Sequence, residues 1–268
     1  MRLIRLASPE GPRHACLHPD GNRTWVDGDV LGEYRVTREP APADSVLLAP
    51  IQPSMIYAIG LNYRAHAAET GATVPQQPVL FMKNIGAVIG PAATIEIPVQ
   101  AASAKVDFEC ELAVVIGKPC KNVSAAQALD YVLGYTCAND VSARDWQMEW
   151  GGGQYCRGKS FDTFCPLGPA LVTADEIPDP NTRRIRTVLN GATMQDSNTA
   201  DMVFPVRTLI DFLSASTTLQ PGSVILTGTP SGVGAGRKPP LWLKAGDQVD
   251  VVIDRIGVLS NVVGMEQR

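Results

Sequence analysis

Two glutamates at alternate positions of an apolar segment could bind a metal ion. Glu109 and Glu111 lie inside the apolar run 106–116. In a β-strand, residues two apart point to the same face about 7 Å apart, so the two carboxylates would project together and repel each other. A divalent cation would neutralise this repulsion, and Asp140, at the end of a second apolar run, could supply a third carboxylate. Oxygen ligands suit Mg²⁺, Mn²⁺ or Ca²⁺ rather than zinc or copper. The alternative is a pair of exposed strand acids with an unrelated turn aspartate.

Polar residues continue at regular spacing after the third acid. Asp140, Arg144 and Gln147 are four and three residues apart. A helical turn following the strand would place all three side chains on one face, directed into the metal site. The alternative is an ion pair between Asp140 and Arg144, with Gln147 in solvent.

A histidine and a glutamate could form an acid/base pair. His66 and Glu69 are three residues apart in a segment expected to be a short helix, so they can contact each other. Glu69 would then orient His66 as a base towards water. In isolation, the same pair would more often be an exposed helix face.

Three other patterns are not expected to carry chemistry. Residues 227–234 read TGTPSGVG after an apolar strand, but the Lys-Ser/Thr of a phosphate-binding loop is missing and no helix pattern follows, which argues against nucleotide binding. His14 and His18 are four apart, but Pro19 follows and no helix is signalled, so we expect a surface loop rather than metal ligands. The six cysteines contain no CxxC pair and are expected to be reduced thiols. Cys110 should be buried on the strand face opposite Glu109 and Glu111.

Composition narrows the classes of function. The chain has 268 residues, of which 45% are hydrophobic and 19% charged, as in an ordinary globular protein. A formal charge of −4 without a run of basic residues gives no electrostatic footprint for nucleic acid or an anionic membrane. No secretory signal or membrane span is evident, so we expect a cytoplasmic protein with a small-molecule ligand.

The elements that must position these residues are mostly strands. Residues 1–50 indicate a small β-rich N-terminal domain, with a turn at 18–22, and the proline-rich segment 39–53 suits a boundary. A larger domain is expected over 51–268. Its predicted strands cover 55–60, 106–116, 135–139, 170–173, 184–190, 223–227 and 248–253.

Three helices are signalled. Asn62 could cap a helix that ends at Gly71, and Ser124 with Gln127 resembles a capping box for a helix over 125–133. Pro205 should begin a third helix, whose apolar residues are Val206, Leu209, Ile210 and Leu213. Because these helices do not alternate with strands, we predict a mainly β, α+β fold built on a curled or sandwiched sheet.

Several long motifs in order resemble the fumarylacetoacetate hydrolase family. The resemblance runs from about residue 51 to the C-terminus and is carried by YAIGLNYRAHAAETG (57–71), VDFECELAVVIG (106–117), GYTCANDVSARDWQ (134–147), RGKSFDTFCPLGP (157–169), QDSNTADMVFPV (195–206) and LTGTPSGVG (226–234). Such a series is more specific than any single pattern. It implies a mixed β-sandwich roll, a homodimer, and bound magnesium or manganese.

The resemblance also implies roles for individual residues. The metal triad falls on Glu109, Glu111 and Asp140, and the remaining octahedral positions are left for water or substrate oxygens. Lys159 is similar to an active-site lysine, whose pKa would be lowered by burial and by the nearby cation. The other implied roles are a catalytic pair on a lid, loosely held in the free protein, for His66 and Glu69, and substrate binding for Arg144, Gln147 and Thr229. The triple glycine 151–153 departs from the shorter linker associated with this segment, which affects the placement of Tyr155 and Arg157.

These assignments lead to a hypothesis of metal-dependent enolate chemistry. A 2-oxo acid or β-diketo acid would chelate the metal, which polarises the carbonyl and stabilises the enolate formed on carbon-carbon cleavage. If His66 with Glu69 delivers water, an acylpyruvate or fumarylacetoacetate-like dicarboxylate is hydrolysed to two acids during small-molecule catabolism. Without water delivery, a decarboxylase acting on an oxaloacetate-like acid or an isomerase of the 2-hydroxyhepta-2,4-dienedioate type are the alternatives. A non-catalytic metal-binding protein is a second alternative, against which the acid/base set argues.

Overall fold

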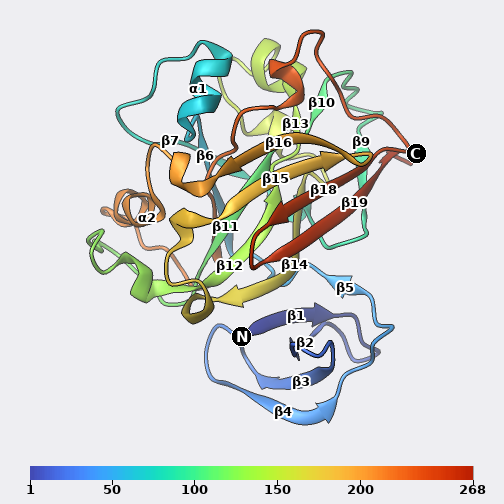
Figure 1. The fold of residues 1–268 in the computed structure, drawn as a ribbon, viewed down its shortest axis with the longest axis vertical. Helices are drawn as coiled ribbons and strands as arrows, with labels where there is room; N and C mark the ends of the chain where they lie inside the picture. Colours follow the sequence, from blue (N-terminus) through green and yellow to red (C-terminus); the bar gives the residue numbers. More distant parts are fainter. Residues whose placement is uncertain (268) are drawn as a thin grey trace.

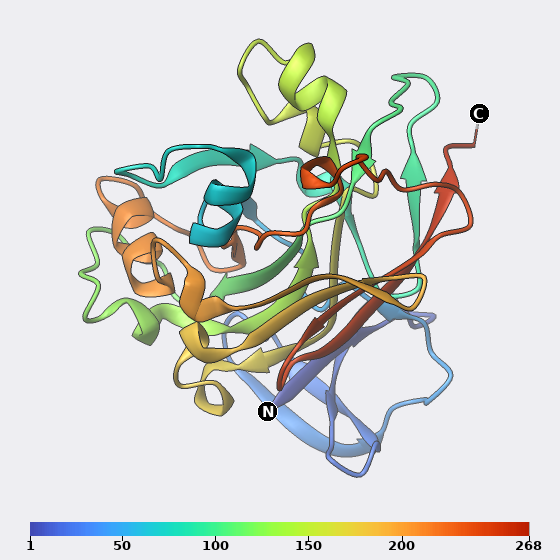
Figure 2. The ribbon, with the colours of Figure 1, turned by 45° about the horizontal axis from the view of Figure 1, so that its top comes forward.

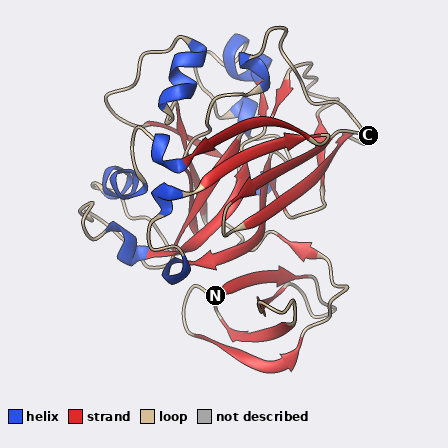
Figure 3. Cartoon of the chain, viewed as in Figure 1, coloured by secondary structure: helices blue, strands red, loops and turns tan. Residues whose placement is uncertain are grey.

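Strands make up most of the regular structure, and short helices lie around them (Figure 1, Figure 3). The computed structural model describes residues 1–267. Its largest sheet has 12 strands, ordered β4 (Tyr34–Pro40), β3 (Arg23–Gly28), β2 (Arg13–Leu17), β1 (Arg2–Leu6), β14 (Cys165–Thr173), β12 (Val132–Asn139), β11 (Cys110–Ile116), β17 (Ser223–Leu226), β6 (Met55–Gly60) and β7 (Val79–Lys83), with β5 (Leu47–Leu48) on β1 and β8 (Val88–Ile89) on β14. A five-stranded sheet follows the order β16 (Ala192–Asn198), β15 (Arg184–Leu189), β18 (Gln248–Ile253), β19 (Gly257–Met265) and β9 (Thr94–Ile97). The predicted mainly β, α+β class is confirmed.

The helices are short. The α-helices are α1 (Arg64–Thr70) and α2 (Val206–Ser214), and η3 (Asp145–Glu149) is a π-helix. The 3₁₀ turns are η1 (Ile85–Ala87), η2 (Ala128–Tyr131), η4 (Arg157–Lys159), η5 (Ala174–Glu176), η6 (Pro180–Thr182), η7 (Thr199–Asp201) and η8 (Gly234–Gly236). No helix within residues 1–267 has the length and apolar character needed to cross a lipid bilayer.

The N-terminal strands form an antiparallel meander below the rest of the molecule (Figure 1). The predicted turn joins β2 to β3 through a hydrogen bond from the His18 N–H to the Asn22 carbonyl. Strand β1 also pairs with β14, where Arg2 lies opposite Val172, so the meander continues the large sheet. His14 lies in β2 and not in the expected loop; its Nε2 contacts the Pro50 carbonyl oxygen at 3.0 Å.

Strand β11 is buried on both faces. Its odd positions include Glu111, Ala113 and Val115, and the latter two pack in a core that extends to the N-terminal Leu3. Its even positions, Cys110 and Leu112 among them, pack against α2 and the five-stranded sheet, which crosses in front of β11 and β12 (Figure 1, Figure 2). Cys110 is therefore on the face opposite Glu111, as predicted from the two-residue period. All six cysteines are free, as expected.

The predicted strand 106–116 is interrupted at the acidic site. Residues 106–107 form β10 (Val106–Asp107), which pairs with β13 (Ser142–Ala143), and β11 starts only at Cys110. The register is the same on both sides of the gap, with Asp107 opposite Ser142 and Cys110 opposite Asn139. At Glu109, however, the N–H donates to the Asn139 side chain, which replaces a regular ladder bond.

The helix predictions met different outcomes. Helix α2 is confirmed and buries the predicted apolar residues. Helix α1 exists, but Tyr63 and not Asn62 is its N-cap residue. The Asn62 amide instead binds the backbone of Thr227 and Phe204, and so ties the start of α1 to two distant segments.

Two other helix predictions are wrong. The segment 125–133 forms only the turn η2, because the Ser124 hydroxyl bonds the Gln127 side chain and neither side chain caps a backbone N–H. The helical turn expected to carry Asp140, Arg144 and Gln147 starts too late: Asp140 lies between β12 and β13, and the π-helix η3 begins at Asp145.

Candidate active site

The acidic triad lies at the interruption between paired strands. The continuous register places Glu109 opposite Asp140, and the Asp140 N–H donates to the Glu109 carbonyl at 2.9 Å. Directly opposed residues of an antiparallel pair share a face, and Glu111, two residues on, falls on the same face. Glu111 lies opposite Ala138, whose small side chain leaves room for the carboxylate. All three acids are buried, and one oxygen from each lies within 4.8 Å of the others.

Lys159 binds two of these acids directly. Its ammonium donates to Glu109 Oε2, Asp140 Oδ2 and Ser142 Oγ, each at 2.7 Å. Glu111 is held differently, because its Oε2 accepts the Gly228 N–H at 2.6 Å. Gly228 has a φ of +95°, and a Cβ there would lie 2.7 Å from the Cβ of Asn62, so only glycine fits at this close approach.

Arg144 is a second cation of the site, and its partners differ from those considered in the sequence. Its Nη2 lies 2.8 Å from Asp107 Oδ2 and 2.7 Å from Glu109 Oε1, and it does not pair with Asp140. Its Nη1 donates to Gln147 Oε1 at 2.9 Å. Gln147 is buried and not in solvent. The alternative of an Asp140–Arg144 pair is therefore excluded.

Two buried charged residues complete the cluster. The Lys83 ammonium donates to Asp140 Oδ1 at 2.6 Å and also to the carbonyl oxygen of Lys159. The Asp107 carboxylate accepts the backbone N–H groups of Gly234 and Ala235. Lys83 thus fixes the Asp140 carboxylate and the backbone of Lys159, while Asp107 connects β10 to the loop that follows β17.

The electrostatics of the cluster fit a bound cation. Burial raises the pKa of Glu111 well above its usual range, and the nearby Asp140 and Glu109 charges raise it further. Burial also raises the pKa of Glu109, but Lys159 and Arg144 outweigh this and lower it to about 2. Four carboxylates, including Asp107, face the three cations Lys83, Arg144 and Lys159, which leaves one formal negative charge in excess.

The donor set is also suitable for a hard metal ion. One oxygen from each acid lies within 4.8 Å of the others, close enough for a single hard cation to contact all three. Because the triad consists of buried oxygen ligands alone, it could bind a divalent metal ion.

The ammonium of Lys159 has a pKa shift opposite to that expected from the sequence. Burial lowers the pKa of Lys159, but the charges of Asp140 and Glu109 raise it by more, so the net pKa is raised. On balance, the protein's own groups therefore raise the pKa of Lys159 and do not lower it.

A cavity of about 270 Å³ brings most of the predicted site residues together. Its lining includes His66, Glu109, Glu111, Arg144, Gln147, Lys159 and Thr229. Asp140 and Glu69 are not part of this lining. Asp140 nevertheless binds the ammonium of Lys159, and Glu69 contacts His66. Tyr155, two residues after the triple glycine, also lines the cavity and packs edge-on against Phe81.

The His66–Glu69 pair is formed and anchored. His66 Nδ1 lies 3.3 Å from Glu69 Oε2, and His66 is only 8% exposed. The Glu69 carboxylate also accepts the Gly232 N–H, at 2.9 and 3.1 Å to its two oxygens. Because a carboxylate only accepts, the Nδ1 of His66 carries the hydrogen, which leaves the lone pair of Nε2 free to act as a base. In this structure the Gly232 N–H, in the loop 227–234, holds Glu69, and a loosely held pair in the free protein stays a prediction.

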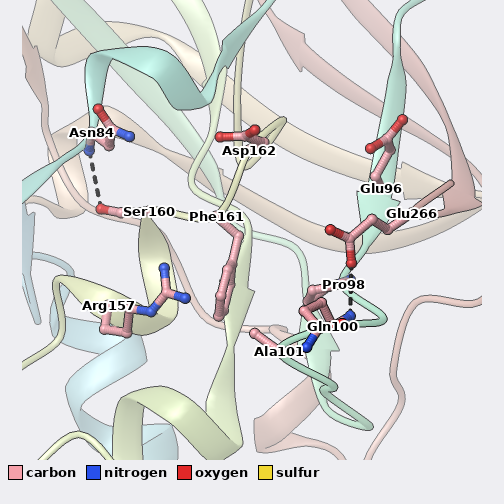
Figure 4. A pocket seen from close by; sticks show the side chains of 10 residues that line it. All are labelled: Asn84, Glu96, Pro98, Gln100, Ala101, Arg157, Ser160, Phe161, Asp162 and Glu266. Atoms are coloured by element: carbon pink, nitrogen blue, oxygen red, sulfur yellow. Dashed lines mark hydrogen bonds between the residues drawn. The ribbon is translucent and has the colours of Figure 1, made fainter. Parts of the chain in front are cut away.

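A second cavity, of about 310 Å³, is lined in part by the segment that carries Lys159, but its other lining residues are different. Figure 4 shows Arg157, Ser160 and Phe161 on one side and Glu96 and Glu266 on the other. Arg157 stacks over the Phe161 ring, and Glu266 accepts the backbone N–H of Gln100. No metal-binding group of acids is found here within residues 1–267.

Sequence reasoning missed three residues of the site: Lys83, Asp107 and Gln195. Lys83 is a lone lysine ending the apolar strand β7, and Asp107 stands two residues before Glu109. Gln195 opens one of the family-like motifs and contacts Thr229. A buried charged or amide residue in an apolar strand was the available signal, but its partners are far away in the chain.

Comparisons with known proteins agree with the fold. The family model described as fumarylacetoacetate (FAA) hydrolase C-terminal matches residues 55–264. The chain is 53% identical over 218 residues to oxaloacetate tautomerase fahd2, mitochondrial, of Xenopus laevis, covering 81% of this chain and 68% of the relative. A solved structure of 5-carboxymethyl-2-hydroxymuconate delta-isomerase from Mycobacterium smegmatis has 42% identity and a TM-score of 0.87, covering 99% of this chain and all of that one. A fumarylacetoacetate hydrolase from Exiguobacterium antarcticum has 35% identity and a TM-score of 0.89, over 99% of this chain and 100% of that one.

Proposed function

Because this chain belongs to the fumarylacetoacetate hydrolase family, we propose that it is a metal-dependent enzyme that interconverts the keto and enol forms of a small 2-oxo dicarboxylate of the oxaloacetate type. Relatives named as an oxaloacetate tautomerase and a delta-isomerase support a proton-transfer reaction. The observation that carries the proposal is the position of two proton-transfer groups, His66 and Lys159, on the lining of the cavity that contains Glu109 and Glu111.

The residues of the site have complementary tasks in such a reaction. Tautomerisation removes a proton from the carbon beside the 2-oxo group and adds one to the carbonyl oxygen. His66 Nε2 can accept the carbon-bound proton, since Glu69 holds the hydrogen on Nδ1. The Lys159 ammonium binds Glu109 and Asp140 and can deliver a proton to the oxygen.

Substrate and cation would bind at the same wall of the cavity. Mg²⁺ or Mn²⁺ held by Glu109, Glu111 and Asp140 would supply electrostatic stabilisation of negative charge on the substrate oxygens. Arg144, Gln147 and Thr229 would bind the substrate's carboxylate and carbonyl groups, because they present one guanidinium, one amide and one hydroxyl at this wall. We further propose a homodimer located in the cytoplasm, which light scattering and cell fractionation would test.

Hydrolysis of a carbon-carbon bond is the second candidate. It is favoured by the anchored His66–Glu69 pair, which could activate water as well as accept a carbon-bound proton. Decarboxylation of an oxaloacetate-like acid needs neither activated water nor a carbon-bound proton to be removed.

Product analysis separates these reactions. The protein loaded with Mg²⁺ or Mn²⁺ would be incubated with oxaloacetate, acylpyruvates and hydroxymuconate-like diacids, with enol content followed by ultraviolet absorption and products identified by mass. We expect the enol and keto forms of oxaloacetate to equilibrate faster without a change of mass. Two acids formed from an acylpyruvate, without catalysis of equilibration, would reject tautomerisation in favour of hydrolysis.

The variant His66→Ala gives a second criterion. Loss of the base should lower keto–enol interconversion roughly 100-fold or more, as general base catalysis is worth about that factor. Decarboxylation should fall less, because it needs no base at that position. Equal losses in the two reactions would contradict this division of roles.

A further inference from the structure

Gln195 lies outside the cavity lining but hydrogen-bonds a residue of that lining. It belongs to β16 and is only 1% exposed. Its Oε1 accepts the Cys110 N–H at 3.0 Å and the Thr187 hydroxyl at 2.6 Å. Its Nε2 donates to Thr229 Oγ1 and to the Pro230 carbonyl, both at 2.8 Å. All the hydrogen-bonding capacity of the amide is therefore used.

Two of these partners allow only one orientation of the amide. The Cys110 N–H can only donate, so it must face the amide oxygen. The Pro230 carbonyl can only accept, so it must face the amide nitrogen. In a flipped amide, the nitrogen would face the Cys110 N–H, donor against donor, and the oxygen would face the Pro230 carbonyl, acceptor against acceptor. Such opposition is costly at a buried position.

The fixed amide determines the role of the Thr229 hydroxyl. Because Nε2 donates to it, Oγ1 is an acceptor in that bond and its own hydrogen must point elsewhere. Among residues 1–267, no acceptor lies within hydrogen-bond reach of that hydrogen, and Thr229 lines the cavity beside Glu111. The hydroxyl hydrogen is consequently free to donate to a ligand.

We propose that Gln195 is a positioning residue, which sets the Thr229 hydroxyl as a hydrogen-bond donor to a carboxylate oxygen of the ligand. The inference rests on the proposed function for the class of ligand, a small carboxylate. It adds a determinant of specificity, because the directed hydroxyl selects an acceptor and disfavours a ligand that presents a donor at the same place.

The variant Gln195→Glu tests the direction of the bond with little change of shape. Its Oε1 keeps the Cys110 and Thr187 partners. Its second oxygen, protonated to bind the Pro230 carbonyl, would accept from the Thr229 hydroxyl and so reverse that bond. Loss of a hydrogen bond to a charged ligand group predicts roughly a ten- to hundred-fold weaker affinity for oxalate. The affinity for Mg²⁺ should stay within about twofold, since Thr229 is not among the proposed metal ligands.

Further variants distinguish the effect of the hydrogen-bond direction on oxalate binding from effects of charge and of folding. Gln195→Met removes the directing donor without adding a charge, and should also weaken oxalate binding. Thr229→Val should reproduce the loss, whereas Thr229→Ser, which keeps a hydroxyl, should bind nearly as wild type. Gln127→Glu, at an exposed position, controls for the change of charge. Combining Gln195→Glu with Thr229→Val should weaken binding no further than either alone, because both act on one hydrogen bond.

Isothermal titration of the Mg²⁺-loaded protein with oxalate decides the outcome. Normal oxalate affinity in Gln195→Glu and Gln195→Met, beside a loss in Thr229→Val, would overturn the role of Gln195. Additive losses in the double variant would also overturn it. Absence of oxalate binding by the wild type would overturn the inference together with the proposed substrate class. If oxalate binding depends on Gln195 while oxaloacetate is not tautomerised, the inference stands and the proposed reaction fails.

Discussion

The three acids of the triad are neutralised to different extents by the protein. Glu109 and Asp140 bind the Lys159 ammonium, whereas Glu111 has, among residues 1–267, only the Gly228 N–H as a hydrogen-bond donor. Glu111 is therefore the acid whose charge the protein neutralises least, which agrees with the upward shift of its pKa by burial and by its acidic neighbours. A divalent cation would have its largest effect on this residue.

The first prediction concerns Glu111→Gln. The amide keeps the shape of the side chain but removes one of three carboxylates, so Mg²⁺ affinity should fall at least roughly 100-fold and metal-dependent turnover should be lost. Without metal, the variant should unfold at the same temperature as the wild type or higher, because like-charge repulsion is relieved. Titration calorimetry and thermal unfolding measure these effects, with the exposed Glu149→Gln as control. Unchanged Mg²⁺ affinity would remove Glu111 from the metal site.

Lys83 shows how a residue outside the cavity supports the site. Lys83→Met leaves one oxygen of the buried Asp140 without its cation and the Lys159 carbonyl without its donor. Breaking a buried pair in this way should lower the free energy of unfolding by about 3 kcal/mol. Urea denaturation checks this against Lys105→Met, which breaks an exposed pair with Glu149 and should change stability little. Equal stability of both variants would mean that Lys83 is not needed to hold Asp140.

At the scale of elements, helix α1 depends on a distant residue for its first turn. Its N-cap residue Tyr63 makes no side-chain cap. Instead, the Asp201 carboxylate accepts the Ala65 N–H, and the carbonyls of Asp201 and Met202 accept from Arg64. The helix that carries His66 and Glu69 is therefore attached at one end to η7 and, through Glu69, to the loop 227–234.

Asp201→Ala should loosen this helix selectively. Loss of a cap of this type predicts roughly two- to thirty-fold faster hydrogen exchange at the backbone amides of α1. Asp179→Ala removes a similar cap in η6 and should leave exchange in α1 unchanged. Hydrogen-exchange mass spectrometry of both variants makes the comparison. The same protection of α1 in both would show that packing, rather than this cap, holds the helix.

The elements also show what could be predicted from the sequence. The strands at 55–60 and 248–253 have the predicted bounds, because a continuous apolar run in the first and an alternating one in the second are local patterns. The placing of Glu109 and Glu111 together was predicted for the same reason, since they stand two apart. The interruption at Glu109 and the partners of Lys83 could not be predicted, because they depend on contacts with residues some 30 and 57 positions away.

At the scale of the whole molecule, one sheet connects the N-terminal meander to the site. Strand β14 pairs with β1 on one side and with β12 on the other, and β12 in turn pairs with β11, which carries Glu111. Leu3 of β1 packs in the same core as Phe108 and Ala113. The separate N-terminal domain at 1–50 stays a prediction, but its strands share both a sheet and a core with the rest of the chain.

This continuity predicts the effect of removing residues 1–50. The truncation would expose the edge of β14 and uncover Ala170, which packs against the N-terminal Ile4 and Trp25. An exposed edge strand beside uncovered apolar surface favours aggregation. We therefore expect the full chain to unfold in urea in a single transition, and residues 51–268 alone to be less stable and largely insoluble. Circular dichroism and sedimentation of the two proteins test this. A soluble truncated protein that binds Mg²⁺ as tightly as the full chain would show that the meander is an independent domain, which the acidic site does not need.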